Sequence, residues 1–295
     1  MRNTMLAFTV LLSLTLASPA FAKLNVVATL PWIGSLAQEI GGNKVAVTTL
    51  VKPSQDPHFL EAKPSMILAA RRADIVMYQG LDLEIGYLPI IIEQSRNPLI
   101  MPGRPGNLDC SRFVNVIEKH AVVERSMGDI HPLGNPHYNF SPVNVLRVAE
   151  GMTTVLAGLD RANAEAYRSN FKAFAARFEE KRKQWNRPDL KGKRYVAYHH
   201  YFEYLAADYG FGIAAYVEPK PGIPPSAAHI EKLVSDMRSS KPDGILVTPS
   251  YGLKEAEALS AKTGVKVIVL PQDVGAVKGS DTWFAFMDTV LAALR

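Results

Sequence analysis

The seven histidines of this 295-residue chain are the side chains whose type and placement best suit chemistry. An imidazole serves as a general base or as a metal ligand, and each use needs particular neighbours. The sequence contains no G-x-S-x-G, H-E-x-x-H, G-x-x-x-x-G-K-[ST] or G-x-G-x-x-G pattern, so the common hydrolase and nucleotide-binding signatures are absent. The single cysteine, Cys110, excludes a site built from several thiolates. Metal binding by imidazole is one chemistry that these histidines could carry, and a position at the surface is the alternative for each of them.

Four candidate ligands stand where the local sequence pattern breaks. His58 lies in D-P-H-F-L-E-A-K-P, where two prolines stiffen the backbone, and His137 lies in G-N-P-H-Y-N-F-S-P. His199 ends one apolar run, and Asp273 follows another. In parallel α/β sheets ligands gather at the carboxyl ends of strands, which is where His199 and Asp273 are expected.

Three imidazoles and one carboxylate form a complete ligand set for Zn²⁺, which takes four such ligands at about 2.0–2.2 Å. Long stretches of chain separate His58, His137, His199 and Asp273, so no local spacing rule predicts that they meet. The residues alone leave an alternative open, in which these histidines lie in loops and face solvent.

Apolar runs rich in β-branched residues alternate with helical patterns on both sides of the middle of the chain. This alternation predicts parallel sheets covered by helices on both faces. The expected strands are 24–30, 44–51, 73–80, 193–199, 214–219, 243–249 and 265–271, and the main expected helices are 32–42, 64–73, 200–211, 226–240, 253–264 and 282–295.

A long helical pattern separates the two α/β halves. From Pro142 to Trp185 only Gly151 and Gly158 weaken it, which predicts one long rigid helix joining two lobes. The alternative is two stacked helices divided at Gly158–Asp160. The expected organisation is a signal peptide (1–22), an N-terminal lobe (23–141), a linking helix (142–187) and a C-terminal lobe (188–295).

The first 22 residues have the features of a secretory signal. A positive start and an apolar run precede the small-x-small site Ala20-Phe21-Ala22, so we expect cleavage near Ala22 and a soluble periplasmic protein. The residue directly after that site is Lys23 and not a cysteine, which argues against a lipid anchor. The mature chain would hold 32 basic and 28 acidic residues, a dispersed excess that gives no support for nucleic-acid binding.

These segments resemble the motifs of a known family, the metal-binding solute-binding proteins of bacterial ABC importers, in the zinc/manganese group called cluster A-I. Its first motif, D-P-H-x-x-E-x-x-P, is matched by Asp56-Pro57-His58, Glu61 and Pro64. Its second is matched by Asn135-Pro136-His137 and Pro142. Its third, H-D-A-F-x-Y-h-x-x-x-Y-G with h apolar, is matched by His199, Phe202, Tyr204, Tyr209 and Gly210. Its acidic fourth segment is matched loosely by Asp273-Val274-Gly275.

The resemblance implies a metal held in the cleft between two lobes by His58, His137, His199 and Asp273. The chain departs from the family pattern at Asn139 and Ser141, and His200 stands where the family has aspartate. His200 is therefore an alternative ligand or supporting residue, and Glu61 is a candidate to orient His58. No His-rich loop is present: only His120 and His131 lie between the first two ligands, and we expect both, like His229, at the surface.

The function that follows is high-affinity binding of a divalent transition metal, most simply Zn(II), and its delivery to a membrane permease with a cytoplasmic ATPase. We expect a monomer, no enzyme activity, limited lobe closure and loading by a periplasmic metallochaperone. Three alternatives stay open: a protein specific for Mn(II), a zinc-dependent hydrolase with Glu61 as its base, and an adhesin on the same fold.

Overall fold

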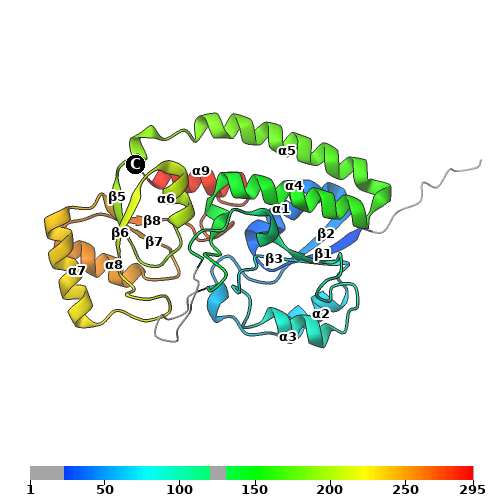
Figure 1. Cartoon of the computed structure of the whole chain (residues 1–295), viewed down its shortest axis with the longest axis horizontal. Coiled ribbons are helices and arrows are strands. Elements are labelled where there is room, and N and C mark those ends of the chain that lie inside the picture. Colours follow the sequence, from blue (N-terminus) through cyan, green and yellow to red (C-terminus); the bar gives the residue numbers. More distant parts are fainter. Residues whose placement is uncertain (1–22, 120–130, 295) are drawn as a thin grey trace, which may run out of the picture.

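The computed structural model describes residues 23–119 and 131–294, and it has two lobes, each built on a four-stranded parallel sheet (Figure 1). The strand orders, β2-β1-β3-β4 and β6-β5-β7-β8, follow the same pattern. In each sheet the second strand along the chain pairs with one side of the first strand, and the third strand pairs with its other side. Ligands of such sheets bind where the strand order reverses in this way, beyond the carboxyl ends of the strands. The predicted class of two parallel α/β lobes is confirmed.

The N-terminal lobe forms because short apolar strands alternate with helices that begin at prolines. Its strands are β1 (Leu24–Ala28), β2 (Val45–Thr49), β3 (Ile75–Tyr78) and β4 (Asn107–Asp109). Its helices are α1 (Pro31–Gly41), α2 (Pro64–Arg71) and α3 (Leu88–Ser95), each with a proline in its first turn, where the missing N–H costs nothing.

The C-terminal lobe repeats this plan. Its strands are β5 (Arg194–Ala197), β6 (Gly212–Tyr216), β7 (Gly244–Val247) and β8 (Val267–Val269). Its helices are α6 (Glu203–Tyr209), α7 (Ala227–Ser240), α8 (Leu253–Thr263) and α9 (Trp283–Ala293). Side-chain caps start two of them: the hydroxyl of Ser226 accepts from the His229 N–H at α7, and that of Thr282 accepts from the Ala285 N–H at α9.

Two helices, not one, connect the lobes. The predicted continuous helix over 142–187 is wrong: α4 (Pro142–Leu159) ends at Asp160, and α5 (Ala164–Gln184) returns beside it (Figure 1). The Asp160 carboxylate holds the turn by accepting from Asn163 Nδ2 at 2.8 Å and the Tyr167 hydroxyl at 2.7 Å. The sequence allowed this break at Gly158–Asp160. The boundaries of the expected domains stay a prediction.

Helix α5 alone runs along both lobes. Its 21 residues make it about 31 Å long, enough to pack on α1 and to reach α9. Midway along α5, Phe174 packs on Phe284 with ring centres 4.9 Å apart, and just after its last residue Trp185 packs edge-on against Trp283 at 5.6 Å. One continuous core therefore includes residues of both lobes. Within the described ranges no helix is both long and apolar enough to span a bilayer.

Candidate metal centre

Three of the predicted ligands lie together between the lobes. His58 belongs to a 3₁₀ turn, Pro57–Phe59, in the segment after β2. His137 caps the 3₁₀ turn Tyr138–Phe140 that leads into α4, and His199 lies just beyond β5. The ring centre of His58 is 5.2 Å from that of His137 and 5.3 Å from that of His199, and the last two are 5.5 Å apart.

These separations suit imidazoles around one ion. A nitrogen bonded to zinc at about 2.0 Å puts the ring centre about 3.2 Å from the ion, so tetrahedral ligands have ring centres about 5.2 Å apart. The three measured values lie within 0.3 Å of that figure. The arrangement can therefore hold a metal without moving the rings far.

His58 is oriented by its neighbour Asp56. The Asp56 carboxylate accepts from the His58 backbone N–H at 3.0 Å and lies 2.6 Å from its Nδ1. Burial would raise the pKa of Asp56, but the hydrogen bonds from His58 hold it below its usual value. Because a carboxylate only accepts, Nδ1 carries the proton and Nε2 carries the lone pair. That Nε2 is buried and has no hydrogen-bond partner, as expected of a metal-binding atom.

His199 has an equivalent partner in Glu218. The Glu218 Oε2 lies 2.6 Å from His199 Nδ1, so Nε2 again faces away from the carboxylate with its lone pair. Glu218 follows β6, is 2% exposed, and accepts through Oε1 from the Tyr251 hydroxyl at 2.6 Å and the Gly222 N–H at 2.8 Å. Burial lowers the pKa of His199 despite the opposing bond to Glu218, which favours the neutral, metal-binding imidazole.

His137 is as deeply buried as His199. Burial, together with the nearby His58 and His199 rings, lowers its pKa well below the usual value, and its Nε2 is buried without a partner. The Asn135 Oδ1 accepts from the His137 backbone N–H at 2.8 Å, while the Asn135 Nδ2 donates to the His200 carbonyl at 2.9 Å. The side-chain amide of Asn135 thus holds the backbone of His137 and connects it to the C-terminal lobe.

His131 also lies at this cluster, so the prediction that it is a surface residue is wrong. Its ring centre is 5.3 Å from that of His58 and 6.3 Å from that of His137. Ligand nitrogens of these three residues all lie within 4.8 Å of one another. The His131 Nε2 is buried and has no partner, and burial with the nearby His58 and His199 lowers its pKa to about 3.

Asp273 is engaged elsewhere. Its Oδ1 accepts from the Trp32 N–H at 2.8 Å and from the Val274 N–H at 2.6 Å, and burial raises its pKa to about 8. Trp32 lies in the first turn of α1, whose own N-cap residue provides no side-chain cap. The groups of three ligand atoms within 4.8 Å of one another among the described residues include neither Asp273 nor His199. What distinguishes Asp273 is that two backbone N–H groups engage its Oδ1.

The two supporting candidates have other positions. Glu61 is exposed, and since the His58 Nδ1 faces Asp56, the prediction that Glu61 orients His58 is not met. His200 stacks on Tyr216 at 3.8 Å, and its Nδ1 lies 3.6 Å from Glu118 and 3.6 Å from Glu203. It therefore faces away from the other imidazoles. His120 and the predicted signal peptide lie outside the described residues.

Tyr201 closes one side of the cluster. Its ring centre is 4.4 Å from that of His137 and 4.7 Å from that of His199, and its side chain is buried. Tyr201, His137 and Asp273 also line one small cavity of about 30 Å³. The Tyr201 ring therefore packs on two of the imidazoles and borders the cavity that Asp273 also lines.

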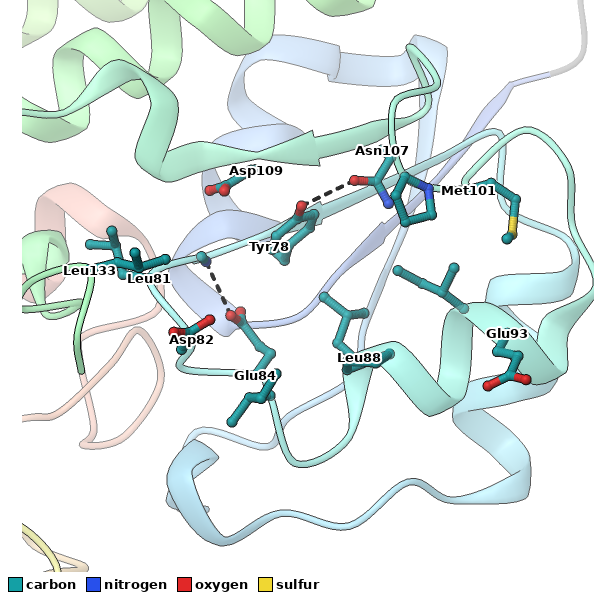
Figure 2. Close-up of a pocket in the computed structure, with 15 residues that line it drawn as sticks. Tyr78, Leu81, Asp82, Glu84, Leu88, Glu93, Met101, Asn107, Asp109 and Leu133 are labelled. Carbon is teal, nitrogen blue, oxygen red and sulfur yellow. Dashed lines mark hydrogen bonds between the residues drawn. The ribbon is translucent and has the colours of Figure 1, made fainter. Parts of the chain in front are cut away.

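A larger cavity belongs to a different part of the molecule. It has about 400 Å³, lies in the N-terminal lobe, and is lined mainly by apolar side chains such as Tyr78, Leu88, Met101 and Leu133 (Figure 2). No described histidine lines it. It is not part of the imidazole cluster.

Four residues of the site were missed by sequence reasoning. Asp56 had a usable signal, because an aspartate two residues before a ligand histidine can cap its turn and bind its ring. Glu218 had a weaker one, as an acidic residue at the carboxyl end of a predicted strand. His131 and Tyr201 had none, since only the folded chain brings them to the cluster.

Comparison with known proteins is consistent with this geometry. The family model described as ZnuA, zinc-uptake complex component A, periplasmic, matches residues 26–295. Among curated proteins, the metal ABC transporter substrate-binding lipoprotein ScbA of Streptococcus cristatus is 25% identical over 279 residues, covering 90% of this chain and 86% of its own. The iron-binding protein YfeA of Yersinia pestis is 26% identical over 254 residues, covering 83% and 75%.

Solved structures share the fold. A crystal structure of ZnuA superposes with a TM-score of 0.73 at 22% identity, covering 92% of this chain and 98% of that one. The Cd-bound periplasmic metal-binding protein of Candidatus Liberibacter asiaticus gives 0.75 at 22% identity, with 92% and 98% covered. The solute-binding protein FpvC of P. aeruginosa, in complex with Ni²⁺, gives 0.71 at 23% identity, with 92% and 97% covered.

Proposed function

The chain belongs to the ZnuA family of metal-binding substrate-binding proteins of ABC transporters, and we propose on this premise that its cargo is Zn(II). The family consists of solute-binding proteins and not of enzymes, so the zinc in this proposal is cargo and not a catalyst. The zinc-dependent hydrolase is thereby set aside.

One observation carries the choice of zinc: three buried imidazoles meet with ring centres 5.2–5.5 Å apart. We propose His58, His137 and His199 as ligands. Imidazole suits Zn²⁺, whereas Mn²⁺ prefers carboxylate, carbonyl and water oxygens. Asp56 and Glu218 support the proposal, because each fixes the ring of one proposed ligand with its Nε2 lone pair free for the ion.

Other metals are named for similar proteins. YfeA and MtsA are named for iron, and the FpvC structures hold Ni²⁺ or Mn²⁺. The Mn(II)-specific alternative therefore belongs in the same experiment as zinc. We further propose that the chain works as a monomer in the periplasm and passes its ion to a permease with a cytoplasmic ATPase. A periplasmic metallochaperone is proposed to load it.

The direct test is anaerobic titration of metal-free protein with Zn²⁺, Mn²⁺ or Fe²⁺ against a chromophoric chelator. We expect one Zn²⁺ per chain, bound at least about 100-fold more tightly than Mn²⁺. His199→Ala should weaken zinc binding more than about tenfold, and His200→Ala should stay within about threefold of wild type. Tighter binding of Mn²⁺ or Fe²⁺ than of Zn²⁺ would refute zinc as the cargo.

A matched control is available on helix α7. His229 lies away from the cluster, with its Nε2 at 3.1 Å from the Tyr216 carbonyl. His229→Ala removes one imidazole from the protein, so any unspecific loss of metal binding would show there. Equal losses in His199→Ala and His229→Ala would contradict the assignment of His199.

A further inference from the structure

His131 has the features of a metal ligand although the sequence motifs do not include it. Its Nε2 is buried and has no hydrogen-bond partner, and one of its ring nitrogens lies within 4.8 Å of ring nitrogens of His58 and His137. An unpaired polar atom in such a position costs free energy unless a ligand satisfies it. Among described side chains, the same kind of unpaired nitrogen is found on His58 and His137.

Asp273, the expected fourth ligand, already has a structural role. Its Oδ1 accepts two backbone N–H groups, one of them in the first turn of α1. To bind an ion with this oxygen, it would have to give up part of that cap. The Tyr201 ring packs on His137 and His199, and it lines the same cavity as Asp273.

The charge of the site is balanced without Asp273. Two carboxylates stand directly behind proposed ligands, Asp56 at 2.6 Å from His58 and Glu218 at 2.6 Å from His199. Together they match the two positive charges of a divalent ion, with four neutral imidazoles as the direct ligands. A third carboxylate bonded to the metal would leave the centre with excess negative charge.

Resting on the proposed function, we infer that the metal is held by four imidazoles, with His131 in place of Asp273 as the fourth ligand. The site then selects ions that accept four nitrogen ligands, such as Zn²⁺, over oxygen-preferring ions such as Mn²⁺. His58, His131 and His137 come from the N-terminal lobe and its connection to α4, and His199 comes from the C-terminal lobe.

X-ray absorption at the zinc edge of the wild-type holoprotein tests the ligand set without any mutation. Four imidazoles in the fitted shell support the inference, and three imidazoles with a carboxylate oxygen overturn it. Removing His131 as His131→Ala should leave three imidazoles and raise the dissociation constant for Zn²⁺ more than about tenfold. Circular dichroism of each variant confirms that it is folded.

Asp273→Asn provides the matched comparison, because its amide oxygen can still accept from Trp32 and Val274. We expect its zinc affinity to stay within about threefold of wild type, since the side chain is not bonded to the ion. A large loss in Asp273→Asn with no loss in His131→Ala would overturn the inference while leaving zinc transport intact. Failure of the wild-type protein to bind zinc at all would instead refute the proposed function.

Discussion

The carboxylate of Asp273 in the C-terminal lobe accepts the backbone N–H of Trp32, in the first turn of α1 in the N-terminal lobe, at 2.8 Å. The helix has no side-chain cap of its own, so a residue 241 positions away provides one. This bond connects the two lobes beside the proposed metal centre. It gives Asp273 a structural function that does not depend on a metal.

Asp273→Ala should therefore lower the stability of the metal-free protein. Loss of a helix cap costs about 1–2 kcal/mol, and here the freed Trp32 N–H is buried. Urea unfolding of the metal-free variant measures the loss. Asp273→Asn is the control and should keep most of the stability, because its oxygen still accepts. An unchanged midpoint for Asp273→Ala would show that the cap contributes nothing.

Asp56→Asn should weaken zinc binding without removing a ligand. The amide no longer carries the charge that holds the proton on His58 Nδ1, so the ring loses its fixed tautomer and part of its basicity. We expect a loss of about 10- to 100-fold in zinc affinity, measured by chelator competition. Glu61→Gln changes an exposed carboxylate of the same motif and should bind as wild type. An equal loss in both variants would contradict a specific role for Asp56.

Tyr201→Ala should change the metal preference of the protein. The ring packs on His137 and His199, so removing it leaves room for a water oxygen to reach the ion. Affinity for Mn²⁺ should then rise relative to Zn²⁺ by about tenfold, because manganese prefers oxygen ligands. Paired titrations measure the ratio. Tyr201→Phe keeps the ring and should keep the wild-type preference, so a shift in both variants would implicate the hydroxyl instead.

Glu84 should make stability depend on pH. Burial raises its pKa to about 7, although Thr29 and the Gln79 and Gly80 N–H groups bond to it. Figure 2 shows the last of these three bonds. The unfolded chain releases this proton near its usual pKa of 4.5 and the folded chain only near 7, so unfolding releases a proton between these values. Stability should fall by up to about 3 kcal/mol as the pH rises through that window.

Glu84→Gln is the matched variant for this effect, because it keeps the shape and cannot ionise. Denaturant unfolding of both proteins at pH 5 and pH 8 gives four free energies. The wild type should lose more stability than the variant between the two values. If the free energy of unfolding changes equally in the two proteins between pH 5 and pH 8, Glu84 is not the group that causes the pH dependence.

Periodicity and composition were sufficient to predict the alternating elements and two parallel sheets, because strand and helix patterns are local properties. The break at Asp160 was only an alternative, since its cause is a set of hydrogen bonds to Asn163 and Tyr167. His58, His137 and His199 were found through their motifs. The position of His131 and the engagement of Asp273 depend on contacts across the fold, and no pattern near either residue reports such contacts.

Metal binding should leave the relative position of the lobes nearly unchanged. Helix α5 packs on α1 and reaches α9, where Lys181 Nζ lies 2.6 Å from Asp288 and the Trp185 indole donates to the same carboxylate at 2.8 Å. With a continuous core across both lobes, a large rotation would have to break this packing. Spin labels at the exposed Asn43 and Lys254, measured by pulsed dipolar spectroscopy, should show a shift below about 2 Å on adding zinc. Trp283→Ala loosens the aromatic contact between α5 and α9 and should broaden the measured distance distribution. A shift of several ångströms in the wild type would establish that the lobes close around the ion in spite of this helix.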